Sequence, residues 1–450
     1  MIRSTFCVLI FAVLPAAVPT VAQEPRAAAP DPTALRLEMA RAFVAQMAAG
    51  QFDQAVAPFD PTMARALPAG KLQELWTGLT RQYGPLQQAT ETRTERVRQY
   101  EAVYVVCEFQ RGRLEAKVVF TLESKVAGLF FLPAGKYRPA SYVEPSKFDE
   151  SEIQVGGGVW NLPGTLSLPK GEGPFPAVIL VHGSGPQDRD ESIGPNKPFR
   201  DLAQGLASCG VAVLRYEKRT KHHPLKMALS VGSITVKEET VDDVVAAFDA
   251  LTSHEKIDPK RIFVLGHSLG GMLLPRIGKA REGIAGFISL AGSTRPMEDL
   301  VLDQTRYLLA LQGEPGEEAQ KKLDELGRQV AMVKSAELAQ DTPWHELPLG
   351  LPARYWLDLR GYEPAEAAKE VRHPMLFLQG ERDYQVTMAD FAGWKKSLGS
   401  RPDVTFIAYP KLNHLFVEGE GQSTPAEYSI PGNVAKVVVD DIAKWIAGAR

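Results

Sequence analysis

Residues 261–275, RIFVLGHSLGGMLLP, place a short apolar run before a glycine-rich turn and a second apolar run after it. The first run is typical of a buried parallel strand and the second of the start of a helix. Between them, Gly266 to Gly270 form a G-x-S-x-G pattern centred on Ser268. The two glycines allow strand and helix to approach closely while the serine adopts a strained backbone conformation. The stretch therefore predicts a nucleophile elbow with Ser268 as the nucleophile.

A serine hydroxyl is a poor nucleophile at neutral pH and needs a base that is oriented by a carboxylate. Two later apolar runs end suitably: LFLQ at 376–379 leads to Asp383, and FIAY at 406–409 leads to His414. In a parallel sheet both loops lie at the carboxyl ends of the strands, beside the elbow. We therefore expect His414 to be the base and Asp383 the orienting carboxylate. Glu381 is the alternative carboxylate, and the Gly-x-x-Asp spacing after the strand favours Asp383.

The run PAVILV at 176–181 predicts another buried strand, followed by His182-Gly183-Ser184-Gly185. Glycines permit the tight loop that turns a backbone N–H toward a developing oxyanion. We expect the amides of Ser184 and Leu269 to form the oxyanion hole. A plain glycine-rich turn is the alternative, and a phosphate loop is less favoured because no Gly-Lys-Ser/Thr follows. The charges at 187–191 either rim the pocket or form a solvated loop with internal ion pairs, which we favour.

Residues 151–450 alternate strands and helices, which predicts an α/β fold with a mostly parallel sheet covered by helices on both faces. Asn161 to Leu168 is expected to be an edge strand, and Thr235 to Glu238 form a capping box that begins a helix. From 293 to 372 the alternation stops and the chain becomes helical and charged. An insertion of this size at this place predicts a helical lid.

The chain before this domain has a different character. Helical patterns from Asp31 to Tyr83 precede strand patterns that reach Leu132, which predicts a small α+β domain at 31–135, and 136–150 is expected to be a linker. The order of elements loosely resembles the cone-shaped domain similar to nuclear transport factor. We favour a structural or oligomerising role for it over a second active site.

Composition excludes little. With 44% hydrophobic and 23% charged residues and a net charge of −3, the 450-residue chain is typical of soluble proteins and gives no support for nucleic-acid binding. Residues 1–22 have a basic start and an apolar stretch, which predicts a cleavable signal peptide and an exported protein that is soluble once cleaved; a retained anchor is the alternative. We expect no metal site, because no CxxC or HExxH pattern occurs, and no cofactor, because the expected serine chemistry needs none. Whether Cys107 and Cys209 form a disulfide is left open.

The loop His182 to Asp190, the stretch Gly194 to Phe199 and the elbow together resemble bacterial α/β-hydrolases of the EstD-type carboxylesterase group. These are related to serine aminopeptidases and to dienelactone-hydrolase-like proteins. Over about residues 150–450 the resemblance implies a serine carboxylesterase for short acyl esters. It implies the roles expected above for Ser268, Asp383 and His414. The alternatives are a peptidase or acyltransferase with the same triad, or a non-catalytic binding protein.

Overall fold

The computed structural model describes residues 32–97, 99–135, 137–230, 234–311, 313 and 316–449. The predicted signal peptide at 1–22 lies outside these residues. The described chain divides into two compact units. One comprises residues 137–424 and 432–449, and the other comprises residues 32–135 together with Pro425–Pro431.

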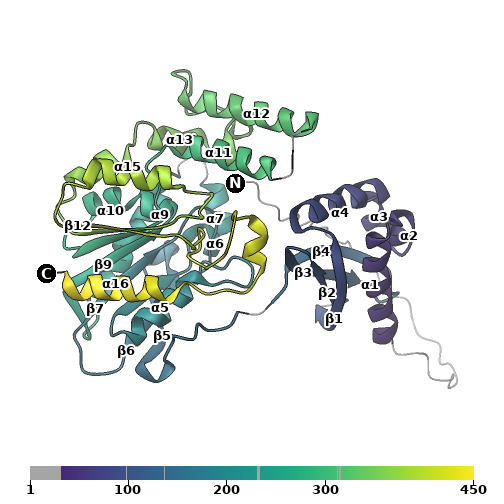
Figure 1. Ribbon diagram of the computed structural model, residues 1–450, viewed down its shortest axis with the longest axis horizontal. Helices are drawn as coiled ribbons and strands as arrows, with labels where there is room; N and C mark the ends of the chain where they lie inside the picture. The colour runs from purple at the N-terminus through teal and green to yellow at the C-terminus, as the bar shows by residue number, and fades with distance from the viewer. Residues whose placement is uncertain are drawn as a thin grey trace. The chain divides into compact units, whose positions relative to one another are not determined.

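The smaller unit packs four helices against a four-stranded antiparallel sheet with the order β1-β2-β3-β4 (Figure 1). Its aromatic core includes Phe43, Trp76 and Phe109. The elements are α1 (Pro32–Ala48), α2 (Phe52–Val56), α3 (Pro61–Ala66), α4 (Ala69–Tyr83), β1 (Leu86–Val97), β2 (Tyr100–Phe109), β3 (Gly112–Phe120) and β4 (Val126–Pro133). The predicted α+β character is confirmed. Strand β1 was not predicted, because its polar sequence LQQATETRTERV lacks the apolar alternation of a half-buried strand.

The larger unit is built on an eight-stranded sheet with the order β12-β11-β10-β9-β7-β8-β6-β5. The strands are β5 (Phe148–Val155), β6 (Leu162–Pro169), β7 (Phe175–Val181), β8 (Ala212–Tyr216), β9 (Ile257–His267), β10 (Gly286–Leu290), β11 (Met375–Gly380) and β12 (Val404–Tyr409). From β8 to β12 neighbouring strands are parallel, and β6 runs antiparallel to both of its neighbours, β8 and β5. The predicted α/β fold with a mostly parallel sheet is confirmed.

The edge of this sheet differs from the prediction. The segment predicted as an edge strand is β6, which pairs with β8 on one side and β5 on the other. The true edge is β5, which begins at Phe148 within the stretch expected to be a linker. Its side chains Asp149 to Gln154 are mostly exposed and polar, so the sequence there has no apolar signal.

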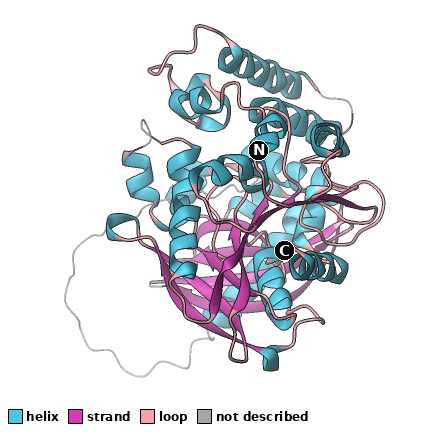
Figure 2. Cartoon of the chain, turned by 90° about the vertical axis from the view of Figure 1, so that its left-hand side faces the viewer, coloured by secondary structure: helices cyan, strands magenta, loops and turns pink. Residues whose placement is uncertain are grey.

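Helices cover both faces of the sheet (Figure 2). Alternate residues of the central strand β7 belong to two separate apolar clusters, with Ile179 in one and Leu180 in the other. The first cluster contains residues of α8 (Asp242–Thr252), α9 (Leu269–Met272), α10 (Leu274–Ala280) and α15 (Met388–Leu398). The second contains residues of α5 (Pro198–Ser208) and α16 (Lys436–Gly448). The two-sided burial explains why the inner strands read as continuous apolar runs.

A helical insertion separates β10 from β11, where a lid was predicted (Figure 1). It contains α11 (Met297–Ala310), α12 (Glu317–Lys334), α13 (Ala353–Leu359) and α14 (Pro364–Ala367). Shorter elements of the chain are α6 (Arg219–His222), α7 (Pro224–Leu229), the π-helical turn η4 (Lys237–Val241), and the 3-10 turns Pro145–Lys147, Gly158–Trp160, Trp344–Glu346, Pro348–Gly350, Ala368–Glu370 and Pro425–Ser429.

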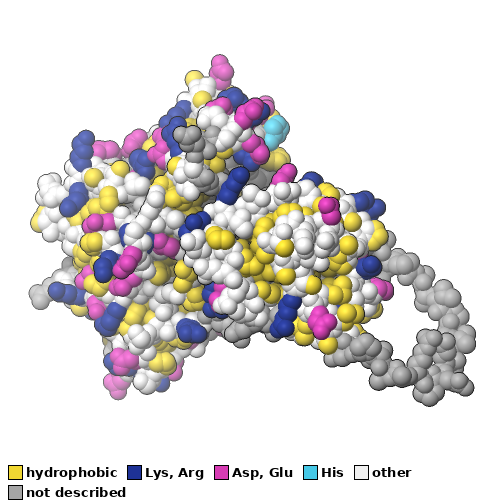
Figure 3. All heavy atoms as spheres, turned by 45° about the vertical axis from the view of Figure 1, so that its right-hand side comes forward, with side chains coloured by type: hydrophobic (Ala, Val, Ile, Leu, Met, Phe, Trp, Pro, Cys, Tyr) yellow, Lys and Arg dark blue, Asp and Glu magenta, His cyan; other side chains and the backbone are white. Residues whose placement is uncertain are grey.

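Acidic and basic side chains are interspersed on the molecular face that Figure 3 displays. Within the described residues, no helix combines the length and the apolar composition that crossing a membrane requires. Cys107 is buried in the smaller unit, Cys209 is exposed in the larger one, and both are free thiols.

Candidate active site

Ser268 stands at the turn between β9 and α9 with φ 54° and ψ −115°. This is an uncommon conformation for a residue with a side chain. The turn is possible because its neighbours lack a Cβ: one added to Gly266 would lie 2.3 Å from backbone atoms of Gly270, and one added to Gly270 would lie 2.4 Å from the carbonyl oxygen of Val181. The Ser268 N–H donates to the carbonyl of Leu290 at 2.9 Å, which fixes the turn to β10. Unlike the buried residues on either side of it, Ser268 is partly exposed.

Asp383 and His414 are in contact, and both are buried. His414 Nδ1 lies 2.6 Å from Asp383 Oδ2. Asp383 Oδ1 accepts from the backbone N–H groups of Gln385 at 2.7 Å and Val386 at 3.0 Å. Because a carboxylate accepts hydrogen bonds, Nδ1 of His414 is the donor in this contact, and Nε2 is left as the ring nitrogen available for proton transfer. Glu381, the alternative carboxylate, is exposed.

The elbow and the histidine loop are joined directly. His267 Nε2 donates to the backbone carbonyl of His414 at 2.9 Å, and the two imidazole rings lie 4.6 Å apart between centroids. Because β9, β11 and β12 are parallel, the loops that carry Ser268, Asp383 and His414 leave the same edge of the sheet. The three loops that the sequence predicted to carry the nucleophile, the carboxylate and the base thus lie at one edge of the sheet.

The loop after β7 lies beside the elbow. A Cβ added to Gly183 would lie 3.2 Å from Ser268 Cβ, so this glycine permits close approach to the serine. Gly183 N–H donates to Glu191 Oε1 at 2.7 Å, and the Gly183 carbonyl accepts from Lys218 Nζ at 2.8 Å. Ser184 follows in the same loop, and Leu269 is the first residue of α9. Of the two residues expected to supply oxyanion amides, Ser184 therefore follows a glycine that lies against Ser268, and Leu269 follows Ser268 directly in the chain.

His182 begins this loop and is a structural residue in it. Burial lowers the pKa of its imidazole to about 4, so the ring is neutral near pH 7. Its Nε2 donates to the carbonyl of Asp188 at 3.0 Å, and the ring packs against Phe199 and Tyr216. The hydrogen bond from His182 to Asp188 therefore joins the first residue of the loop to a residue near its end.

The charged residues at 187–191 do not form the solvated loop with internal ion pairs that the sequence analysis favours. Asp190 is buried and pairs with Arg215 and Lys197, and Glu191 is only 1% exposed. Glu191 Oε2 lies 3.0 Å from His267 Nδ1 as an ion pair without the alignment of a hydrogen bond. Burial alone would raise the pKa of Glu191 and lower that of His267. Burial is the largest single influence on each group. The attraction between them, the hydrogen bonds with the Gly183 N–H and the His414 carbonyl, and the neighbouring charges together outweigh it, so the pKa of Glu191 is lowered and that of His267 is raised.

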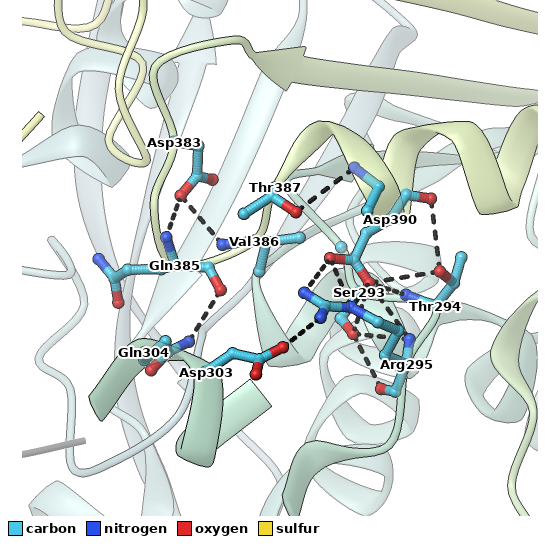
Figure 4. Close-up of polar contacts among 12 residues, drawn as sticks. Ser293, Thr294, Arg295, Asp303, Gln304, Asp383, Gln385, Val386, Thr387 and Asp390 are labelled. Carbon is cyan, nitrogen blue, oxygen red and sulfur yellow. Dashed lines mark hydrogen bonds and ion pairs between the residues drawn. The ribbon is translucent and has the colours of Figure 1, made fainter. Parts of the chain in front are cut away.

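The loop that carries Asp383 packs against the root of the helical insertion (Figure 4). Arg295 forms an ion pair with Asp390, which is fully buried and also accepts from the Thr294 N–H at 3.1 Å. From α11, Gln304 Nε2 donates to the carbonyl of Gln385 at 2.9 Å. The start of the insertion is thus held to α15 through Asp390, and α11 is held to the Asp383 loop by the hydrogen bond from Gln304.

Lys218 and Glu191 are buried charged residues near the elbow; Lys218 was not singled out in the sequence, and Glu191 was considered only as part of the charged stretch 187–191. A partial signal existed for Lys218, because it follows β8 at the carboxyl end of a buried strand. Their contacts with Gly183 depend on the tertiary fold. Among the residues that the structure describes, no three His, Cys, Asp or Glu side chains are grouped as a metal site requires.

Comparison with known proteins agrees with this architecture. Residues 178–428 match the model of the alpha/beta hydrolase family, and residues 40–129 match a domain described as a protein of unknown function (DUF3887). Esterase EstD from Thermotoga maritima is 40% identical over 407 residues, which cover 90% of this chain and 93% of that protein.

Two solved structures are similar to this chain at low sequence identity. An esterase from Pyrococcus furiosus has a TM-score of 0.42 and 15% identity, with 71% of this chain and 96% of that chain covered. Est1E from Butyrivibrio proteoclasticus has a TM-score of 0.42 and 14% identity, with 66% and 98% covered. The match to the family model and the 40% identity with esterase EstD show that the chain belongs to the alpha/beta hydrolase family.

Proposed function

We propose that the protein is a serine carboxylesterase that cleaves esters of short acyl chains through an acyl-enzyme intermediate. The observation that carries the proposal is the buried Asp383–His414 pair, whose histidine backbone is tied to the elbow that holds Ser268. The 40% identity to an esterase over 90% of the chain supports the same reaction class. Nothing in the proposed mechanism requires a cofactor.

In the first step Ser268 Oγ attacks the ester carbonyl carbon while His414 Nε2 takes its proton. Asp383 accepts from Nδ1 throughout and stabilises the imidazolium. The backbone amides of Ser184 and Leu269 stabilise the negative oxygen of the tetrahedral intermediate. The bond to the leaving alkoxide then breaks, and His414 returns the proton to it.

In the second step water takes the place of the alcohol. His414 removes a proton from the water as its oxygen attacks the acyl carbon, and a second tetrahedral intermediate forms in the same oxyanion hole. Its collapse breaks the bond to Ser268 Oγ, which regains its proton from His414. The products are the free acid and the starting enzyme.

Hydrolysis of p-nitrophenyl acetate by protein lacking residues 1–22 tests this proposal. Ser268→Ala is expected to remove nearly all turnover, whereas Ser151→Ala, at an exposed serine of β5, is expected to leave it unchanged. Aminoacyl-p-nitroanilides assayed in parallel separate an esterase from a peptidase. Near-normal ester turnover by Ser268→Ala would end the proposal, and a preference for the anilides would replace it with the peptidase.

We also propose that residues 1–22 direct export to the periplasm or the medium. The support is the basic start followed by an apolar stretch in the sequence. Expression of the full chain, followed by N-terminal sequencing of the protein from each cell fraction, tests this. A mature protein beginning near Gln23 outside the cytoplasm is expected, and an uncleaved cytoplasmic chain would contradict it.

A further inference from the structure

The Gly183 residue is held by charged side chains at both of its backbone polar groups. Glu191 accepts from its N–H and Lys218 donates to its carbonyl oxygen, at 2.7 and 2.8 Å. Gly183 also lies against Ser268, where a Cβ would come within 3.2 Å of the serine Cβ. The backbone beside the nucleophile is therefore oriented by two side chains that the proposed mechanism does not use.

The carbonyl of Gly183 and the N–H of Ser184 belong to one peptide group. A trans peptide is planar, and its C=O and N–H point in opposite directions. A side chain that fixes the direction of this carbonyl therefore fixes the direction of the Ser184 N–H as well. Lys218 binds the carbonyl and therefore lies on the opposite side of this peptide group from the Ser184 N–H.

Lys218 is itself held rigidly. It is 2% exposed, and its Nζ lies 2.8 Å from Glu239 Oε1. The other oxygen of Glu239 accepts from the hydroxyl of Tyr355 at 2.7 Å. Glu239 lies in the π-helical turn η4 and Tyr355 in α13 of the helical insertion. Burying an ammonium and a carboxylate is costly, and a network in which every member is bonded keeps a single geometry.

We propose that Lys218 is a positioning residue for the oxyanion hole: through the Gly183 carbonyl it orients the Ser184 N–H toward the developing oxyanion. Glu239 and Tyr355 hold Lys218 in place, so the network links the helical insertion to the oxyanion loop. This inference rests on the proposed esterase function. It adds a residue that acts on the transition state without touching the substrate.

A neighbouring ion pair provides a matched control. Arg219, the residue after Lys218, is also buried and forms an ion pair with the buried Asp243. The described contacts of Arg219 go to Asp243 and to the face of the Trp160 ring. Replacing this pair disturbs a buried charge pair of similar burial and leaves the Gly183 carbonyl with its donor.

The test compares Lys218→Met/Glu239→Gln, which removes both charges together, with Arg219→Met/Asp243→Asn. The first is expected to lower kcat for a p-nitrophenyl ester about 10- to 100-fold with KM within about twofold, because misplacement of a catalytic group acts on the transition state. The second is expected to keep kcat near that of the wild type. Wild-type kcat in the first variant, or an equal loss in both, would overturn the inference.

A thionoester of the same acid supplies a readout that a purely structural role does not move. Sulfur accepts amide hydrogen bonds more weakly than oxygen, so a thionoester benefits less from the oxyanion amides. The ratio of ester to thionoester turnover is expected to shrink in Lys218→Met/Glu239→Gln by about the factor lost in kcat. A loss of kcat with an unchanged ratio would assign a structural role to Lys218.

Should the double variant fail to fold by circular dichroism, Tyr355→Phe removes a single hydroxyl from the network. It is expected to lower kcat several-fold and to shrink the same ratio, and folded Tyr355→Phe with wild-type values of both would overturn the inference. Failure of the proposed function is distinguishable, because it appears in the wild-type protein as absent ester turnover and would overturn both proposals.

Discussion

At the scale of single residues, the two carboxylates after β11 have opposite environments. Asp383 is buried against His414 and accepts from two backbone N–H groups, whereas Glu381, two residues earlier, is exposed. Both were candidates in the sequence, because both follow the strand closely. The contact with His414 favours Asp383, and its orienting role is part of the proposed mechanism.

Asp383→Asn is expected to lower kcat by about 10³- to 10⁴-fold with a small change in KM, because an amide in place of the carboxylate allows the wrong imidazole tautomer and does not stabilise the imidazolium. Steady-state kinetics with p-nitrophenyl acetate measure this. Glu381→Gln is the matched control and is expected to keep wild-type kinetics. The reverse result would move the orienting role to Glu381.

The Glu191–His267 pair predicts a pH dependence of stability. The lowered pKa of Glu191 contributes stability above its unfolded value near 4.5, which is lost as pH falls through the folded pKa. The raised pKa of His267 contributes stability below its unfolded value near 6.5, which is lost as pH rises through the folded pKa. The pair therefore stabilises most between about pH 4.5 and 6.5.

Glu191→Gln keeps an oxygen that can accept from the Gly183 N–H but removes the ion pair. The free energy of unfolding of this variant is expected to differ most from that of the wild type between about pH 4.5 and 6.5, with the difference shrinking toward pH 9. Urea titrations at a series of pH values measure it, with exposed Glu381→Gln as the control. A difference that grows from pH 6 to pH 9 would contradict the pairing.

At the scale of elements, the helical insertion is tied to the catalytic edge of the sheet at its first helix. Arg295 bridges the buried Asp390 of α15 and Asp303 of α11 (Figure 4). The rings of Tyr307 and Tyr384 are stacked 4.8 Å apart, which adds an apolar contact between α11 and the Asp383 loop. Movement of α11 would therefore disturb Asp383, the proposed orienting carboxylate.

Arg295→Met is expected to lower the free energy of unfolding by about 1–2 kcal/mol, because Asp390 keeps its other donors but loses its charged partner. Arg306→Met, which removes an exposed ion pair with Asp303, is expected to change it by less than about 0.5 kcal/mol. Urea denaturation of the three proteins measures both. Equal effects would show that the contact with Asp390 adds nothing beyond a surface pair.

Strands whose side chains are buried could be predicted from the sequence more readily than strands whose side chains are exposed. The inner strands carry continuous apolar runs and could be assigned from the sequence, and so could the residues that follow them. The polar edge strands β1 and β5 could not, because exposed side chains leave no periodic signal. The contacts of Lys218 with Gly183 and Glu239 could not be predicted either, since they join two loops and the helical turn η4, which only the folded chain brings together.

At the scale of the whole molecule, the smaller unit includes a segment from far along the chain. Pro425–Pro431, which follows His414 by eleven residues, belongs to this unit together with residues 32–135. Ala426 is buried in its apolar core, and Ser429 Oγ lies 3.2 Å from the hydroxyl of Tyr83. The smaller unit is therefore complete only with a segment that continues from the histidine loop.

Ala426→Asp is expected to destabilise the smaller unit by about 2–4 kcal/mol, because it places an unpaired carboxylate in an apolar core. Hydrogen exchange of peptides from β2 and β3 measures the effect where it is expected. Gln422→Asp, at an exposed position just before the segment, is the control and is expected to leave exchange unchanged. Unchanged protection of β2 and β3 in folded Ala426→Asp would contradict the role of the segment.

Covalent labelling tests whether Ser268 is an activated nucleophile, as the proposed mechanism requires. Protein lacking residues 1–22 is treated with a fluorophosphonate, digested and mapped by mass spectrometry, with Ser268→Ala in parallel. We expect one modified peptide, labelled at Ser268 and absent from the variant. Unlabelled wild-type protein that is fully folded, or a label on another serine, would contradict it.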